Sequence, residues 1–355
     1  MLTPQFNDTY NWLRKLTFSR FYNLVAITLS YYISLWLKKP VIWGQPVSIS
    51  VEPTTSCNLR CPECPSGLRS FTRPTGMLDV NLFKGIVDQS YRSASYLLLY
   101  FQGEPYLHPE FTQLVNYASS KGLYTATSTN AHYLTDENSK KTIESGLDRL
   151  IISIDGTTQK TYQSYRVGGK LDKVLEGTRN LIRWKKDLKS KTPYVIFQFL
   201  VVKPNEHQIE EVKALGKELG VDKVAFKTAQ LYDYKNGNDL MPSIEKYRRY
   251  KKIPNQNHSR GDSKSPRESE KYVLKAKLKN QCWKMWHSTV VTWDGSIVPC
   301  CFDKDAEHKQ GDLKGQKIAE IWEGDSYDAF RKRLLTNRKG IDICKNCTEG
   351  TKVWG

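Results

Sequence analysis

The sequence predicts an α/β fold: a partial (β/α)6 TIM-like barrel, preceded by an amphipathic helix and followed by a small cysteine-rich β-hairpin and helix module. Strand-like and helix-like segments alternate through the central part of the 355-residue chain, which is the pattern of a parallel sheet covered by helices. The strand-like segments are continuous apolar runs, as expected for strands that are buried on both faces. Six strand–helix units are present, so we expect a partial barrel rather than a closed one.

The chain divides into four predicted parts. We expect an N-terminal helical segment at residues 1–45, the barrel at 46–231, a basic linker with short helices at 232–281, and the cysteine-rich module at 282–355. This length allows one large domain and one small one. A hydrophobic content of 39% is ordinary for a globular protein and argues against wholesale disorder.

The chain is strongly basic, with a formal net charge of +17 from 54 Lys and Arg against 37 Asp and Glu. Such an excess favours an anionic partner, namely nucleic acid, a membrane surface or an acidic substrate. Aromatic residues are sparse in the basic linker, so we do not expect a nucleic-acid groove. The start of the chain lacks the pattern of a cleavable signal peptide, and the clustered cysteines then indicate metal sites in a reducing cytoplasm.

The N-terminal segment contains an uncharged run at residues 21–37 with basic residues on both sides. Seventeen residues is near the lower limit for a membrane span, and Asn23, Ser30 and Ser34 fall close to one helical stripe. The run therefore predicts an amphipathic helix that Pro40 ends, with the composition of a helix at a membrane interface. A helix packed on the protein's own core is the main alternative, and a transmembrane span is the less favoured one.

The barrel strands are predicted at residues 47–53, 96–101, 124–128, 150–154, 195–202 and 223–227. The helices between them start or stop at residues typical of helix ends, namely Asp79, Pro109, Thr135, Asn205 and Gly220. In parallel barrels the chemistry lies on the loops at the carboxyl ends of the strands. Polar motifs of this sequence fall at those ends.

The loop after the first strand carries three cysteines within eight residues: Cys57, Cys61 and Cys64. The C-x3-C-x2-C spacing suits three corners of an iron–sulfur cube and leaves the fourth iron without a protein ligand. An open metal position at a strand end is where a substrate or cofactor would bind. A structural zinc site with three cysteines is the alternative.

Later strand ends carry three further polar motifs, which are Gln102-Gly103-Glu104-Pro105, Ser128-Thr129-Asn130 and Ser153-Ile154-Asp155-Gly156. Arg166 follows shortly after the last of them. Each motif has a plain structural alternative: Glu104 could cap a helix, Ser153 and Asp155 could form a turn, and Arg166 could be a solvated surface residue. Four motifs in this order at strand ends favour one shared site.

Residues 47–230 resemble the core domain of radical S-adenosylmethionine (SAM) enzymes. The resemblance implies that Cys57, Cys61 and Cys64 form the catalytic centre as ligands of a 4Fe–4S cluster, with SAM on the open iron. It implies SAM contacts from the later strand ends, by Gly103, Glu104, Pro105, Asn130, Ser153, Asp155 and Arg166. In that family Glu104 would accept hydrogen bonds from the SAM ammonium, Ser153 and Asp155 would contact the ribose, and Arg166 would pair with the carboxylate.

Two positions depart from the family pattern. Glu63 stands before the third cysteine, where an aromatic residue is common, which puts the adenine contact in doubt. Gln102 replaces the first glycine of the Gly-Gly-Glu-Pro motif, a milder change because Glu104 and Pro105 are intact.

Five more cysteines follow in the C-terminal module, namely Cys282, Cys300, Cys301, Cys344 and Cys347. Two short β runs around Asp294-Gly295 predict a hairpin between the first two cysteines. Two separated thiolate pairs suit a closed zinc site or a fully ligated 4Fe–4S cluster, and both stay open. The arrangement resembles the SPASM/twitch extension of radical SAM enzymes in its shortened form. That resemblance implies one auxiliary 4Fe–4S cluster on Cys282, Cys300, Cys344 and Cys347, with Cys301 left over.

Together the resemblances imply a radical SAM oxidoreductase that cleaves SAM reductively to a 5′-deoxyadenosyl radical, which abstracts a substrate hydrogen. The auxiliary cluster would transfer electrons, and an external reductant such as flavodoxin or ferredoxin would supply them. We expect a small-molecule, sugar or lipid-linked substrate, because neither a leader-binding domain nor cysteines for a second auxiliary cluster are seen. The alternatives are a peptide-modifying maturase and a non-catalytic iron–sulfur or zinc scaffold on an anionic surface. We expect the protein in the cytoplasm, with an anionic membrane surface as a candidate partner.

Overall fold

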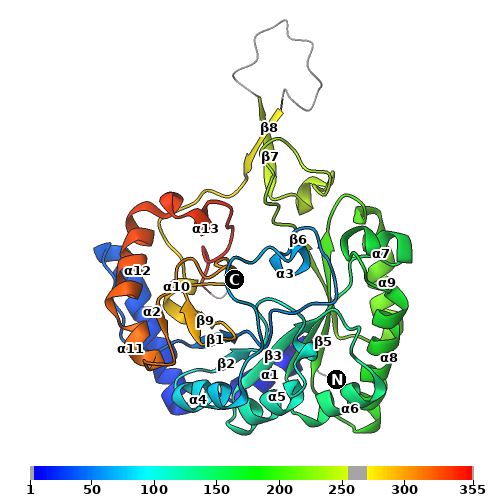
Figure 1. The fold of residues 1–355 in the computed structure, drawn as a ribbon, viewed down its shortest axis with the longest axis horizontal. Helices are drawn as coiled ribbons and strands as arrows, with labels where there is room; N and C mark the ends of the chain where they lie inside the picture. The colour runs from blue at the N-terminus through cyan, green and yellow to red at the C-terminus, as the bar shows by residue number, and fades with distance from the viewer. Residues whose placement is uncertain (1–3, 255–269, 354–355) are drawn as a thin grey trace, which may run out of the picture.

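A parallel sheet forms the centre of the molecule (Figure 1), and the computed structural model describes residues 4–254 and 270–353 of the chain. Its strands are β1 (Ser48–Val51), β2 (Tyr96–Leu98), β3 (Tyr124–Thr129), β4 (Arg149–Ser153), β5 (Tyr194–Val201) and β6 (Lys223–Thr228). They pair in sequence order and all in parallel. The predicted α/β fold with a six-stranded partial barrel is confirmed.

Helices connect these strands and cover the outside of the sheet (Figure 1). They are α3 (Pro65–Leu68), α4 (Val80–Ser90), η1 (Pro105–Leu107), α5 (Phe111–Ser120), α6 (Asp136–Glu144), α7 (Gln159–Tyr165), α8 (Leu171–Asp187), η2 (Glu206–Gln208) and α9 (Ile209–Leu219). The side chains of Asp79 and Thr135 cap α4 and α6, and Gly220 ends α9 with a φ of +77°. Pro109 lies before α5 rather than in its first turn.

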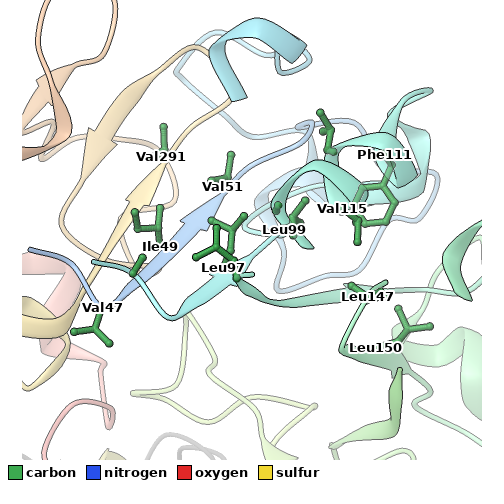
Figure 2. Packing of buried hydrophobic residues seen from close by; sticks show 14 of the residues in the cluster. Val47, Ile49, Val51, Leu97, Leu99, Phe111, Val115, Leu147, Leu150 and Val291 are labelled. Atoms are coloured by element: carbon green, nitrogen blue, oxygen red, sulfur yellow. The ribbon is translucent and has the colours of Figure 1, made fainter. Parts of the chain in front are cut away.

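The core lies between the sheet and the helices. Ile49, Val51, Leu97 and Leu99 are fully buried, and Figure 2 shows them beside Phe111 and Val115 of α5. Burial of one such side chain contributes about 1.5–3 kcal/mol, so these alternating apolar positions fix which face of each strand points inward. The carboxyl ends of the strands, with their polar loops, are thereby held at one edge of a rigid sheet.

The C-terminal module adds three strands to the same sheet. These are β9 (Ser288–Val291), β10 (Ser296–Val298) and β11 (Gly311–Asp312), and they extend it to nine strands. The predicted hairpin is confirmed, because β9 and β10 pair antiparallel across a turn in which Gly295 has a φ of +89°. The remaining elements are α10 (Lys284–His287), α11 (Ile318–Trp322), α12 (Asp325–Asn337), η4 (Arg338–Gly340) and α13 (Asp342–Lys345).

The predicted linker at residues 232–281 contains a pair of strands where the sequence predicts short helices. Apart from the single turn η3 (Glu245–Tyr247), its described part forms an antiparallel pair, β7 (Tyr250–Pro254) and β8 (Glu270–Leu274). Tyr250 is buried and stacks on Tyr234, and frequent lysines between the apolar residues of these strands masked their alternation. Residues 255–269 of the predicted linker lie outside the described residues.

The N-terminal segment forms two helices, α1 (Pro4–Arg14) and α2 (Phe18–Leu37). The predicted polar stripe of α2 is buried against the rest of the protein, as the packed alternative has it, while apolar side chains on the opposite face are exposed. Asn23 donates to the carbonyl oxygens of Gln45 (2.9 Å) and Ser93 (3.1 Å), which satisfies its amide inside the protein. No helix in the described ranges is both long and apolar enough to cross a membrane.

Candidate active site

The three-cysteine loop leaves β1 and ends at α3, at the carboxyl edge of the sheet. Cys57, Cys61 and Cys64 are all free thiols. The backbone N–H of Leu59 points at Cys57 Sγ (3.5 Å), as in an N–H donor to a thiolate. Gly67 allows α3 to pack on the loop, because a Cβ at this position would lie 2.5 Å from the backbone nitrogen of Cys61. Backbone packing therefore fixes the path of this loop.

Burial dominates the acid–base state of Cys57 and Cys61. It raises the pKa of Cys57 to about 12, and it also raises that of Cys61 although the Arg166 guanidinium acts in the opposite direction. The neighbouring thiols raise the pKa of Cys57 and Cys61 further. Three desolvated thiols in one loop are suited to ligate a positive iron centre, which would hold them as thiolates.

Glu104 lies beside this loop and is almost fully buried. Its carboxylate accepts hydrogen bonds from Thr129 Oγ1 (2.7 Å), the Asn130 N–H (2.8 Å) and the Tyr106 N–H (3.3 Å). Burial outweighs these donors and raises the pKa of Glu104 to about 7. A buried carboxylate held in this way is suited to bind a cation such as an ammonium group.

The residues on either side of Glu104 shape its approach to the cysteine loop. Gly103 has a φ of +73°, and a Cβ there would lie 2.2 Å from the carbonyl oxygen of Thr54. Pro105 begins η1 and turns the chain away. Only glycine fits at position 103, which agrees with the predicted close backbone approach.

Asn130 and Ser153 follow the next strands of the barrel, as predicted. Asn130 is buried and donates to the Asn58 side chain (2.8 Å), which ties the end of β3 to the cysteine loop. Ser153 is the last residue of β4 and is also buried. The structure therefore brings Glu104, Asn130 and the cysteine loop together at one edge.

Asp155 and Arg166 form a pair instead of two separate contacts. Asp155 is fully buried, and its oxygens accept from Arg166 Nε (2.5 Å) and the Leu200 N–H (2.6 Å). Arg166 in turn points Nη1 at Cys61 Sγ (3.8 Å). Asp155 thus orients Arg166 beside the cysteine loop, and its predicted ribose contact stays a prediction.

Glu63, which the family pattern does not explain, also has a structural partner. Its carboxylate accepts from the Tyr232 N–H (2.9 Å) and from Asn238 Nδ2 (3.4 Å). Glu63 therefore joins the cysteine loop to the segment that follows β6. A sequence separation of 169 residues hides this contact from local patterns.

The auxiliary cysteines lie in the C-terminal module. Cys282, Cys344 and Cys347 are buried, Cys300 is half-buried, and Cys301 is exposed. Burial raises the pKa of Cys344 to about 12 and that of Cys347 to about 11. Burial raises the pKa of Cys300 well above its usual value, and the nearby thiols of Cys301, Cys282 and Cys347 raise it further. The chemistry of this donor set fits an iron–sulfur or zinc centre.

Two basic residues beside this set were not singled out from the sequence. Buried Arg338 donates to Cys347 Sγ (3.6 Å) and to the carbonyl oxygens of Gln281 (2.7 Å) and Glu349 (2.9 Å). Lys284 places Nζ 3.9 Å from Cys301 Sγ. Positive side chains on two sides favour negatively charged sulfur ligands here.

In the described parts of the chain, no three Cys, His, Asp or Glu side chains stand at metal-ligand distances around one point.

Comparisons with known proteins agree with this geometry. Residues 51–216 match the model of the radical SAM superfamily, and residues 282–348 match the SPASM model of an iron–sulfur cluster-binding domain. The second match favours iron–sulfur over zinc at the auxiliary cysteines.

Relatives extend over most of the chain. It is 25% identical over 318 residues, 84% of this chain and 86% of the relative, to a tungsten-containing aldehyde ferredoxin oxidoreductase cofactor-modifying protein of Pyrococcus furiosus. It is 23% identical over 321 residues, 87% of this chain and 85% of the relative, to the PqqA peptide cyclase of Gluconobacter oxydans. The fold is similar to that of Streptococcus suis SuiB bound to S-adenosylmethionine, with a TM-score of 0.61 and 13% identity over 86% of this chain and 73% of that one.

Proposed function

This chain is a radical SAM enzyme with a SPASM domain, and from this premise we propose that it removes two electrons from its substrate. Its cofactors are a 4Fe–4S cluster, SAM and an auxiliary iron–sulfur centre. When bound, the first cluster and SAM supply a 5′-deoxyadenosyl radical that abstracts a substrate hydrogen. Membership of an enzyme family removes the reason to consider a non-catalytic scaffold.

The residues at the carboxyl edge would hold these cofactors. We assign Cys57, Cys61 and Cys64 as cluster ligands, because three free thiols lie within eight residues of one loop at the carboxyl edge of the sheet. Glu104 would accept the SAM ammonium, since its buried carboxylate is anchored by backbone and hydroxyl donors. Arg166, oriented by Asp155, would pair with the SAM carboxylate.

The observation that carries the oxidative proposal is the four-cysteine set of the module: Cys282, Cys344 and Cys347 are buried, and Cys300 is half-buried. Ligation by four cysteines leaves no open iron for a substrate, so the centre is suited to electron transfer. Arg338 and Lys284 beside it would stabilise an added electron. We therefore propose that this site accepts the second electron from the substrate.

The adjacent pair Cys300 and Cys301 offers a matched test of the ligand set. We expect anaerobically reconstituted protein to hold about eight irons, four for each cube. Cys300→Ala should lose about half of this iron and keep SAM cleavage, measured as 5′-deoxyadenosine formed with dithionite. Cys301→Ala should keep both. If Cys300→Ala keeps all its iron and Cys301→Ala loses about half, Cys301 would be the cluster ligand and Cys300 the spare thiol.

The substrate class has two candidates. A small-molecule, sugar or lipid-linked substrate is our first proposal, and a peptide is the second, supported by similarity to the PqqA peptide cyclase over 87% of this chain. A screen scored by substrate-dependent 5′-deoxyadenosine separates them, with peptides and small molecules as separate pools. Stimulation by the peptide pool alone would overturn the first proposal.

The remaining partners follow from the chemistry. We propose a low-potential reductant of the flavodoxin or ferredoxin type, because reductive SAM cleavage needs one electron for each turnover. We further propose a cytoplasmic location at the inner membrane surface.

A further inference from the structure

The exposed hydrophobic side chains of this protein are concentrated near its amino terminus. Twelve of the eighteen large hydrophobic side chains exposed in the described parts of the chain lie within residues 6–43. Phe18 and Trp36 are 86% and 82% exposed. Scattered exposed apolar residues are normal, but a cluster of this size marks an interaction surface.

Six of these side chains form a single stripe along α2. The stripe consists of Phe18, Phe21, Val25, Leu29, Tyr32 and Trp36, which follow the 3-and-4-residue spacing of one helix face. The opposite face is fixed inside the protein. Arg20 there donates to the carbonyl oxygens of Gly122 (2.6 Å) and Tyr91 (2.7 Å).

These internal bonds leave α2 no freedom to turn over. Asn23 and Ser34 of the same inner face bond to the segment 41–45, and Trp286 donates to Ser34 Oγ (3.1 Å). Rotation of the helix would leave these buried polar groups without partners, at a large cost. The apolar stripe therefore stays exposed.

The charge around the stripe identifies its partner. Between Asp8 and Glu52 the chain has no acidic residue but five basic ones: Arg14, Lys15, Arg20, Lys38 and Lys39. Arg14, Lys38 and Lys39 are exposed and lie beyond the two ends of α2. A second copy of the chain on this face would bring positive ends together, with no acid in the segment to neutralise them.

We propose that the α2 face docks on an anionic phospholipid bilayer, with the helix parallel to the membrane plane. This names the surface for the membrane location proposed above. Aromatic side chains between basic ends are the composition of interfacial helices, and the basic ends would pair with anionic headgroups. The inner face of α2 contacts Gln45, Ser93 and Gly122, which come just before β1, β2 and β3, at the amino ends of these strands. The cysteine loop follows β1, at the opposite, carboxyl end. Docking through α2 therefore leaves the carboxyl edge of the barrel free.

Vesicle co-sedimentation of the full-length reconstituted enzyme tests the proposal. We expect binding to vesicles of phosphatidylcholine and phosphatidylglycerol (7:3) and at least tenfold weaker binding to pure phosphatidylcholine. The double variant Leu29→Glu/Trp36→Glu should lose binding at least tenfold. The control Leu188→Glu, at an exposed apolar position after α8, should bind like the wild type. Light scattering without lipid measures the oligomeric state of each protein.

Three outcomes would overturn the proposal. The first is equal binding to charged and neutral vesicles, and the second is unchanged binding of the double variant. The third is a wild-type dimer that the double variant converts to monomer, which would assign the face to a second copy. The double variant should keep its melting temperature and its 5′-deoxyadenosine formation, because neither residue lies near the cysteine loop. A wild type that binds vesicles but cleaves no SAM would instead refute the proposed function and leave the membrane proposal standing.

Discussion

At the scale of single residues, the candidate active site contains a chain of contacts that runs from a buried backbone N–H to the cysteine loop. Asp155 is anchored by the Leu200 N–H, Arg166 by Asp155, and Cys61 is approached by Arg166. A buried charge pair is favourable only when both partners stay in place. The position of the guanidinium therefore depends on a carboxylate that has no accessible surface.

Asp155→Asn tests this dependence. We expect roughly tenfold weaker SAM binding, about 1.4 kcal/mol, because Arg166 loses the charge that orients it. Calorimetry on the anaerobically reconstituted protein measures the affinity, and iron analysis shows whether the first cluster is retained. Asp136→Asn, which removes an exposed partner of Arg183, is the control and should change neither. Unchanged SAM affinity in Asp155→Asn would mean that Arg166 does not hold the SAM carboxylate.

Residue roles could be predicted from the sequence where they depend on neighbours in the chain. The cysteine spacing and the Gly103-Glu104-Pro105 motif are of this kind, and the structure brings them together at one edge. The role of Glu63 could not be predicted, because its partners Tyr232 and Asn238 come from a distant segment. The same holds for Arg338, whose contacts with Cys347 and Gln281 arise only in the folded module.

At the scale of elements, helix α2 shows what a hydrophobic pattern leaves undecided. The pattern identified an amphipathic helix correctly, but it could not show which face points inward. Asn23, Ser30 and Ser34 are buried because they or their neighbours reach carbonyl groups of the protein, for example at Gln45 and Val41. A polar residue with such a partner can be buried at little cost, and nothing in the local sequence reveals the partner.

Helix α10 and the strand that follows it give a pH-dependent prediction. His287 stacks on Trp283 with ring centroids 5.0 Å apart, and burial lowers the pKa of His287 from 6.5 to about 4. Between pH 4 and pH 6.5, His287 therefore binds a proton in the unfolded chain and stays neutral in the folded protein. Acidification from pH 6.5 to pH 4 should therefore destabilise the fold, by about 3 kcal/mol at most.

Denaturant unfolding at several pH values measures this effect. His287→Gln should reduce the loss of stability on acidification, whereas His207→Gln, at an exposed position of η2, should not. Parallel stability–pH curves for the wild type and His287→Gln would show that another group is responsible.

At the scale of the whole molecule, the barrel and the cysteine module share one sheet. The sequence predicted the barrel and the module as separate parts joined by a linker, and it identified the six barrel strands and the module hairpin but not β11. It could not predict that β9 pairs in parallel with β1, Ser288 opposite Ser48 and Val291 opposite Val51, because such pairing leaves no local signal. The consequence is functional: β1 leads into the first cysteine loop while β9 belongs to the auxiliary module, so one rigid sheet sets their relative position.

A buried ion pair strengthens this junction. Glu52, directly after β1, is fully buried, and it accepts from Arg73 Nη2 (2.6 Å) and Nη1 (2.9 Å) and from the Trp293 N–H (3.2 Å) of the module hairpin. Arg73 also donates from Nε to the Lys304 carbonyl (3.0 Å). Two charged groups thus connect the start of the active-site loop to the auxiliary module.

Removal of one partner should therefore cost much more than removal of both. Arg73→Met leaves the Glu52 carboxylate buried without its counter-ion, and we expect a loss of about 3–5 kcal/mol in the free energy of unfolding. The double variant Arg73→Met/Glu52→Gln removes both charges and should recover most of it. Arg183→Met, which breaks an exposed pair, should stay within about 1 kcal/mol of the wild type. Urea denaturation measures all four proteins. Equal losses in the single and double variants would show that the guanidinium acts through its packing and its bond to Lys304, and that the ion pair does not hold the module to the barrel.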